Sequence, residues 1–214
     1  MKVIVYGASG MVGQGVLREC VLDPDVTEVL TVGRRPLGRT HPKVTDKVVA
    51  DLADLSTLDF TGYDACFFCL GVSSAGMNEE KYRRITYDFT LAAGRKLAVE
   101  SPGATFAYVS GMGTDEHGRQ MWARVKGKTE SDLLALPLKA YMFRPGYIQP
   151  KHGATSRTTL YRVLYVGLAW LYPLIRRVAP RWVTTTEQIG LAMLRLAKHG
   201  DGKKILNPPD INAL

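Results

Sequence analysis

Three glycines near the start of the chain have the spacing of a phosphate-binding turn. Gly7, Gly10 and Gly13 follow the apolar run Val3–Tyr6 at intervals of three residues. We expect Gly7 to allow a tight turn, Gly10 to let phosphates approach the backbone, and Gly13 to let a helix pack closely on the sheet. A helix beginning here directs free N–H groups and the positive end of its dipole at a diphosphate. The turn therefore predicts dinucleotide binding.

The context of the glycines favours a ligand over a simple strand–helix turn. The chain contains 21 glycines, so this spacing alone is weak evidence. However, Lys2–Tyr6 predicts a buried strand and Met11–Cys20 predicts a helix with apolar residues at helical spacing. The residues expected to hold the diphosphate are Gly7, Ser9, Gly10, Met11, Val12 and Gly13.

Two arginines occupy the place that usually selects between the two nicotinamide dinucleotides. The predicted second strand, Thr27–Val32, is followed by Gly33, Arg34 and Arg35. An acidic residue there would accept a hydrogen bond from the ribose 2′-hydroxyl of NAD, whereas arginine can hold the 2′-phosphate of NADP. We therefore predict NADP as the cofactor; the alternative is a solvated basic loop.

The ends of two further predicted strands face the same cofactor. Lys47–Ala50 predicts a third strand, after which Asp51 could accept from the adenine amine and Leu52 could cover the ring. Asp51 could equally begin a turn. Ala65–Leu70 predicts the fourth strand, and we expect Leu70 and Gly71 at its end to offer backbone to the nicotinamide half, with an ordinary turn as the alternative.

A serine, a tryptophan and a lysine have the spacing of a catalytic group. Ser110 ends the predicted strand Ala104–Val109, and Trp122 and Lys126 lie four residues apart at the start of the next helix, side by side on one face. This arrangement resembles the short-chain dehydrogenase/reductase family, which carries Ser and then Tyr-x-x-x-Lys. The resemblance implies that Lys126 holds the nicotinamide ribose and that Ser110 orients a carbonyl.

Four further segments resemble one branch of that family, the Tat-interacting-protein-like atypical short-chain dehydrogenases/reductases, whose bacterial members are often labelled sugar-nucleotide epimerases. The resemblance covers most of residues 1–200. It implies NADP binding by a Rossmann fold, names no substrate, and implies that Pro145 and Gly146 contact the nicotinamide carboxamide. The segments are Phe67–Val72, Tyr82–Asp88, Val125–Glu130 and Phe143–Gly146.

The family tyrosine is replaced by Trp122. Indole has no acidic proton usable near neutral pH and can only donate a hydrogen bond, so Trp122 cannot perform that tyrosine's proton transfer. General acid catalysis typically contributes about 10²–10⁴-fold, so its loss would slow a carbonyl reduction without excluding hydride transfer. Whether the chain is an enzyme stays open at this point.

Strands and helices alternate through the first 145 residues, as in a doubly wound fold. We therefore expect an α/β class protein with a parallel Rossmann sheet, helices on both faces and a small helical C-terminal cap. Residues 1–214 predict a single domain, with 147–180 as a cap on the substrate side. Asn78 should cap a helix stabilised by Glu79–Arg83 and Glu80–Arg84 pairs, and Ala140–Phe143 predicts the sixth strand.

Composition excludes several other classes of protein. The formal net charge is +8, but the basic residues are scattered and form no block interleaved with aromatics, which argues against nucleic acid. Cys66 and Cys69 lie three apart in a strand and so point to opposite faces, which argues against a redox or zinc pair. The four histidines show no metal-ligand spacing, so no metal site is proposed.

The last third of the chain holds an apolar helix pattern at Thr155–Tyr172, and Val163–Ile175 carries no charge. That stretch is too short to span a bilayer. It could form a lid over an apolar substrate, a homodimer contact, a membrane-surface contact beside nearby arginines, or plain core. A last helix, Glu187–Lys198, should be capped by Thr186, and the tail Asn207–Asp210 should be loop.

The leading expectation is a cytoplasmic, NADPH-dependent oxidoreductase, since the N-terminus lacks the apolar run of a signal peptide. Its substrate would be small and apolar, bound between 71–77, 110–114, 147–175, Trp122 and Tyr147. An NADP-sensing regulatory protein is the alternative, and a sugar-nucleotide epimerase is the third.

Overall fold

The fold is built on one parallel sheet. The computed structural model describes residues 1–38, 40–155 and 182–214. Seven strands pair in the order β3-β2-β1-β4-β5-β6-β9, and every pair is parallel. The order reverses between β1 and β4, which is the switch point where Rossmann proteins bind dinucleotides. The strands are β1 Lys2–Tyr6, β2 Glu28–Gly33, β3 Val44–Val48, β4 Ala65–Phe68, β5 Thr105–Val109, β6 Lys139–Phe143 and β9 Ile205–Leu206.

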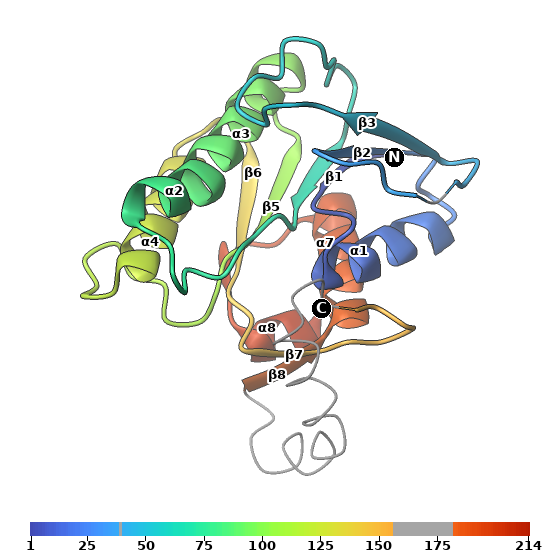
Figure 1. Cartoon of the computed structure of the whole chain (residues 1–214). Coiled ribbons are helices and arrows are strands. Elements are labelled where there is room, and N and C mark those ends of the chain that lie inside the picture. The colour runs from blue at the N-terminus through green and yellow to red at the C-terminus, as the bar shows by residue number, and fades with distance from the viewer. Residues whose placement is uncertain (39, 156–181) are drawn as a thin grey trace.

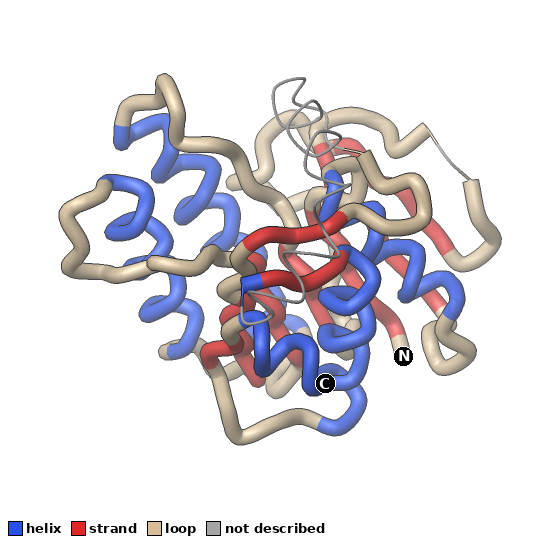
Figure 2. Tube along the Cα trace, turned by 90° about the horizontal axis from the view of Figure 1, so that it is seen from below, coloured by secondary structure: helices blue, strands red, loops and turns tan. Residues whose placement is uncertain are grey.

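Helices cover both faces of this sheet, as Figures 1 and 2 show. On one face α1 (Met11–Leu22) and α7 (Thr186–His199) pack closely together, and α8 (Pro208–Ala213) lies beside α7. On the other face α2 (Glu79–Arg83) leads through a π-helical turn into α3 (Phe89–Glu100), next to α4 (Met121–Leu134). The predicted doubly wound α/β Rossmann fold is therefore confirmed.

Successive side chains of β1 point to opposite faces of the sheet, and this explains why two cores form. Ile4 and Tyr6 of β1 are buried in the core under α3 and α4, whereas Val3 and Val5 are buried in the core under α1 and α7. Cys66 packs in the first core and Cys69 against the second, as the strand geometry predicts, and both are free thiols. Fully apolar strands of this kind suit a sheet covered on both faces.

The ion pairs of α2 differ from the expectation. Asn78 does cap α2, since its side chain accepts from Lys81 N at 3.0 Å. The predicted partners within the helix are wrong, because the carboxylate of Glu79 binds Arg124 of α4 and the guanidinium of Arg84 binds Asp51. The π-helical turn Arg84–Asp88 interrupts the helix that the sequence presented as continuous.

The chain after Gly146 departs most from the expectation. Asn207–Asp210 is not loop: the Asn207 and Asp210 side chains form a capping box, and prolines occupy the first turn of α8, where no N–H partner is needed. The cap of α7 is Thr185, whose Oγ accepts from Gln188 N, while the Thr186 hydroxyl accepts from Lys151 N. The predicted helix Thr155–Tyr172 and the uncharged stretch Val163–Ile175 fall almost entirely outside the described residues.

The strand β9 and the two strands of a second sheet were not predicted. A separate two-stranded parallel sheet, β7 (Tyr147–Gln149) and β8 (Val183–Thr185), lies beyond the carboxyl edge of the main sheet (Figure 1). The third strand is Val44–Val48 rather than Lys47–Ala50, because an edge strand tolerates the polar residues Asp46 and Lys47.

Candidate functional site

The glycine turn joins β1 to α1 with a backbone that only glycine adopts readily. Gly7 has φ +73, in the left-handed region, and Gly10 N donates to Gly7 O at 2.8 Å. A Cβ on Gly7 would lie 2.7 Å from Leu70 N, so the turn sits directly on the end of β4. Gly71 beside it faces open space, with nothing within 4 Å of an added Cβ. The end of β4 therefore lies against the glycine turn, and the contact of Leu70 and Gly71 with the nicotinamide half stays a prediction.

The first turn of α1 fits a diphosphate. Gly13 packs on the turn so closely that a Cβ there would lie 2.1 Å from Gly7 O. Among the described residues no side chain caps α1, and its first turn carries no acid. The amides of Met11 and Val12 are therefore free to meet an anion, beside Gly10 and Ser9.

The side chain of Gln14 holds Thr155 against this turn. The sequence did not predict this contact. Its amide nitrogen donates to Ser9 O at 3.1 Å and to Thr155 O at 3.0 Å, and its oxygen accepts from Thr155 N at 3.4 Å. The Gln14 side chain therefore links the backbone of Thr155 to the backbone of Ser9 in the glycine turn.

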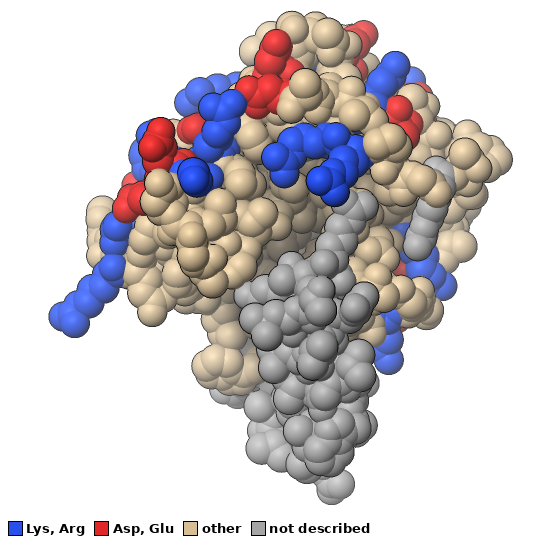
Figure 3. All heavy atoms as spheres, viewed as in Figure 1, with Lys and Arg blue, Asp and Glu red and all other residues tan. Residues whose placement is uncertain are grey.

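Arg34 and Arg35 follow β2 at the same edge of the sheet. Val32 pairs with Tyr6, so the residues after Val32 lie beside the glycine turn. Both arginines are exposed, and the loop they begin is fixed where Leu37 N donates to the Asp46 carboxylate at 2.7 Å. Figure 3 shows a group of basic side chains over the β1–β2 part of this face. The positions suit contact with an anion, and the choice of NADP stays a prediction.

Asp51 and Leu52 both make contacts within the protein. Asp51 Oδ1 accepts from Ala53 N at 3.0 Å, the expected turn, and Oδ2 pairs with Arg84 at 2.7 Å. Leu52 is 1% exposed and belongs to the core, so its side chain is not placed to cover a ring at the surface. The contact of Asp51 with an adenine amine stays a prediction.

Ser110 lies at the carboxyl end of β5 with its proton already engaged. Its Oγ is 3.0 Å from the hydroxyl oxygen of Thr114, and that hydroxyl donates to Gly111 O at 2.7 Å. Because a hydroxyl carries one proton, Ser110 must be the donor to Thr114. Ser110 Oγ can then only accept from a ligand, whereas the expected orientation of a carbonyl needs a donor. The sequence analysis placed Thr114 along the predicted pocket but did not predict its hydrogen bond with Ser110.

Lys126 is brought to the same strand end, as expected. Its ammonium donates to Ser110 O at 2.9 Å and to Val109 O at 3.5 Å, and it lies 5.5 Å from the centre of the Tyr108 ring. Burial lowers the pKa of Lys126 to about 8, against the opposing effect of Glu130. The lysine therefore loses its proton far more readily than an ordinary one.

Trp122 lies one helical turn before Lys126 and is partly buried. Its ring reaches Gly113, since a Cβ on Gly113 would lie 3.4 Å from the indole. The indole thus stands beside the 110–114 loop, consistent with a pocket wall, and supplies no acid.

A buried ion pair behind Lys126 was also missed. Glu130, whose side chain is 3% exposed, is bound by the Arg144 guanidinium through Nε at 3.0 and 3.1 Å and through a second nitrogen. Glu130 follows Lys126 by four residues, a spacing that could have drawn attention to it. The Arg144 guanidinium binds this carboxylate instead, so Lys126 forms no ion pair with an acid within the described ranges.

Pro145, Gly146 and Tyr147 continue the same edge. Met112 N donates to Pro145 O at 3.1 Å, which ties the loop after β5 to the loop after β6. A Cβ on Gly146 would lie 2.4 Å from Trp182 O, so glycine is required by packing. The Tyr147 hydroxyl donates to Gln149 Oε1 at 2.9 Å. The predicted contact with a carboxamide is compatible with this arrangement and stays a prediction.

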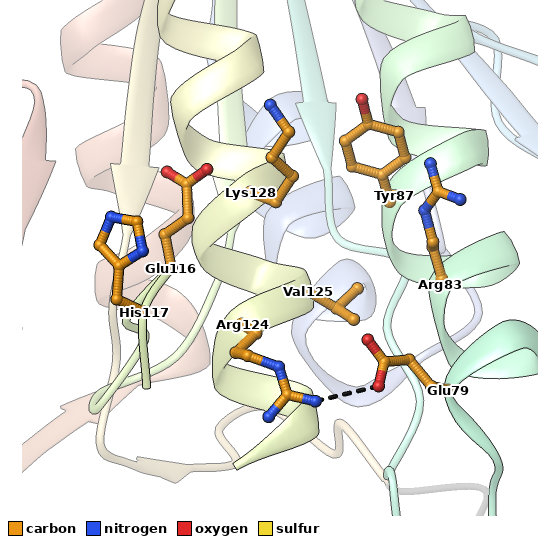
Figure 4. A pocket seen from close by; sticks show the side chains of 8 residues that line it. All are labelled: Glu79, Arg83, Tyr87, Glu116, His117, Arg124, Val125 and Lys128. Carbon is orange, nitrogen blue, oxygen red and sulfur yellow. Dashed lines mark hydrogen bonds and ion pairs between the residues drawn. The ribbon is translucent and has the colours of Figure 1, made fainter. Parts of the chain in front are cut away.

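Two hollows lie away from the predicted substrate pocket. One, about 310 Å³, lies between α2 and α4 and is lined by charged side chains (Figure 4). The other, about 470 Å³, runs along α1 from Ala8 and Ser9 to Val44, at the start of β3. Neither is lined by Ser110, Trp122 or Tyr147. Part of the predicted pocket, residues 156–175, falls outside the described residues.

Two other classes of site have no candidate in the described parts of the chain. Those ranges contain no group of three or more His, Cys, Asp or Glu side chains placed to hold a metal ion. No helix within them is both long and apolar enough to cross a bilayer.

Known proteins resemble this chain in sequence and in fold. The rat protein HTATIP2 is 28% identical over 69% of this chain and 62% of its own length. FMP52 of Saccharomyces cerevisiae, named as mitochondrial, is 31% identical over 68% of this chain and 65% of its own length. The chain is a homologue of HTATIP2 and FMP52, in the atypical short-chain dehydrogenase/reductase group. No protein-family model matches it.

Solved structures confirm the fold of this HTATIP2/FMP52 homologue. The Bordetella bronchiseptica enzyme WbmF, solved in complex with NAD+, has a TM-score of 0.68 at 15% identity and covers 99% of this chain and 76% of its own. A short-chain dehydrogenase/reductase family oxidoreductase of Burkholderia thailandensis has a TM-score of 0.65 at 17% identity, over 92% of this chain and 85% of its own. At these identities the two structures show the fold, a Rossmann sheet that this chain shares with them.

Proposed function

We propose that this protein binds NADP(H) and acts as an NADPH-dependent oxidoreductase on a small, apolar carbonyl compound. The observation that carries the proposal is the glycine turn, where Gly13 packs on Gly7 and α1 offers uncapped amides at the switch point of the sheet. Arg34 and Arg35 support the phosphorylated cofactor, because they stand where an acid would favour NAD.

The cofactor would lie along the carboxyl edge. Gly10, Met11 and Val12 would hold the diphosphate, Arg34 and Arg35 the 2′-phosphate, and Lys126 the nicotinamide ribose. A bound reduced nicotinamide supplies a hydride. Trp122 would wall the substrate side and exclude water, and Pro145 and Gly146 would orient the nicotinamide end. The same edge would admit substrate beside Ser110 and Tyr147.

A regulatory NADP sensor is the second candidate, and a specific observation favours it. Trp122 stands in the place of the family's proton donor, and Ser110 has its proton engaged with Thr114. A sensor predicts NADPH binding with no oxidation of NADPH by any carbonyl, quinone or flavin. An epimerase, the third candidate, predicts tightly retained oxidised cofactor in the purified protein.

Turnover is the experiment that tests the proposal. NADPH oxidation is followed with a panel of small apolar aldehydes, ketones and quinones, for the wild-type protein and for Trp122→Tyr. The proposal predicts measurable wild-type oxidation of NADPH and a faster rate for Trp122→Tyr, since tyrosine restores an acid beside Lys126. NADPH binding without oxidation in either protein would favour the sensor.

Location, partners and domain organisation stay proposals. The whole chain is proposed to act as one cytoplasmic domain, with a mitochondrial location as the alternative because the FMP52 relatives carry that name. Cell fractionation of tagged protein would decide between them. Contact with a second copy is proposed ahead of a membrane surface, and sedimentation with and without vesicles separates the two.

A further inference from the structure

We infer that Lys126 is the proton donor of the reaction, in the role that a tyrosine holds elsewhere in this group. The inference rests on the proposed reduction of a carbonyl. It assigns to Lys126 a step beyond holding the ribose, and it follows from which protons at the end of β5 are free.

The hydroxyl protons at this strand end are committed. Ser110 donates to Thr114, and Thr114 donates to Gly111 O. Releasing the Ser110 proton to a substrate would break its hydrogen bond to the Thr114 hydroxyl oxygen. Trp122 offers an indole N–H that is not acidic near neutral pH. These three side chains therefore do not supply the proton.

The ammonium of Lys126 does have a proton to give. Of its three protons, the described residues accept two, at Ser110 O and Val109 O. The contact with Val109 O is long, at 3.5 Å, so this N–H and the third one are available at the carboxyl edge, one for the ribose and one for the substrate oxygen. The side chain is only partly buried, so a substrate oxygen can reach it.

Burial lowers the pKa of the Lys126 ammonium, and Glu130 acts in the opposite direction. From its own helix Glu130 faces it, but the Arg144 guanidinium at the end of β6 binds that carboxylate through two nitrogens. From β5 the Tyr108 ring faces the ammonium. Burial contributes most to the raised pKa of the Tyr108 hydroxyl, and Tyr82 of α2 lies near enough to raise that pKa further. The pKa of about 8 leaves the lysine mostly protonated at pH 7, and an acid with a pKa near the working pH transfers protons efficiently.

The step balances with the cofactor of the proposed function. The carbonyl carbon gains a C–H bond from the hydride, and its double bond to oxygen becomes a single bond. The oxygen takes a proton from Lys126 Nζ to become an alcohol. The reduced nicotinamide is oxidised by the loss of that hydride. The neutral amine of Lys126 then regains a proton from water.

A direct test measures the titration of Lys126 without any turnover. The intact protein is labelled with a trace of acetic anhydride across the range of about pH 6 to 11, and the labelled peptides are measured by mass spectrometry. We expect half-maximal reactivity of Lys126 near pH 8, and that of Lys128, which is exposed on the same helix, above the ordinary lysine value of about 10.4. Labelling of both lysines in parallel would overturn the inference.

The variant Lys126→Arg separates proton donation from ribose binding. Arginine keeps the charge and its hydrogen bonds but does not release a proton near neutral pH. We expect NADPH affinity within a few-fold of wild type and a rate of carbonyl reduction lower by about 100-fold or more. The wild-type rate should fall above about pH 8 as Lys126 deprotonates. The rate of the variant should not show this fall. Lys128→Arg is the matched control.

The outcomes also separate this inference from the proposed function. If wild-type protein binds NADPH and reduces a carbonyl, a full rate in Lys126→Arg would overturn the proton transfer alone. If wild-type protein binds no NADPH, both proposals fail together. Full loss of NADPH binding in Lys126→Arg, with normal folding, would also contradict the separate role.

Discussion

Gly13 lies against the carbonyl of Gly7 so closely that an added Cβ would come within 2.1 Å of Gly7 O. This contact sets the approach of α1 to β1 and therefore the position of the amides that the dinucleotide would meet. The glycine at position 13 therefore both brings α1 close to β1 and positions the amides of the proposed anion site.

Gly13→Ala should disrupt this approach. Its methyl group would overlap backbone atoms that cannot move independently, so we expect a loss of unfolding free energy of about 3 kcal/mol or more. Gly71→Ala is the control, since nothing lies within 4 Å of its added Cβ. Chemical denaturation of both variants checks the prediction, and equal stability of the two would contradict the packing argument.

Arg34→Ala and Arg35→Ala should weaken NADPH binding more than NADH binding. Each charge-assisted contact with the 2′-phosphate contributes about 1.5–3 kcal/mol, which corresponds to roughly 10- to 100-fold in Kd. Calorimetric titration with both nucleotides measures this. Arg195→Ala, exposed on α7, should change neither affinity. Equal loss for the two nucleotides would remove the case for NADP.

Glu130→Ala should destabilise the fold strongly. It leaves the guanidinium of Arg144, which lies partly buried, without its carboxylate, and removing one partner of a buried ion pair typically costs about 3–5 kcal/mol. Lys128→Ala removes only an exposed pair with Asp132 and should leave the denaturation midpoint nearly unchanged. Similar midpoints for the two variants would show that the buried pair contributes little.

Lys126→Met should stabilise the protein at neutral pH, because it removes a partly desolvated ammonium that pairs with no carboxylate of the described residues. The folded-state pKa of Lys126, about 8, lies below its unfolded value, so the unfolded chain binds more protons between these values. Wild-type stability attributable to this group is therefore lowest below pH 8 and rises as pH increases toward about 10.4. The gap in Tm between variant and wild type should shrink over that range, and a constant gap would contradict the prediction.

The sequence predicted what depends on local pattern. The strand–glycine–helix order around Gly7 and the alternation of strands and helices led to the correct fold. The small elements β7, β8 and β9 were missed because two- or three-residue strands carry no periodicity. Prolines after Asn207 were interpreted as loop, although proline fits the first turn of a helix.

The site was predicted in part for the same physical reason. Ser110 and Lys126 meet because a strand end and a helix start are adjacent in this topology. The partners that decide their chemistry are set by tertiary packing. The Thr114 hydroxyl oxygen accepts a hydrogen bond from Ser110 within the loop after β5, and Arg144 binds Glu130 from the end of β6. Neither contact follows from local spacing.

Calorimetric titration of the purified protein with NADPH and with NADH tests the central claim most directly. The account predicts saturable binding of NADPH at one site per chain, with NADH weaker by at least about tenfold. Absence of heat or of any rise in Tm with either nucleotide at millimolar concentration would contradict it.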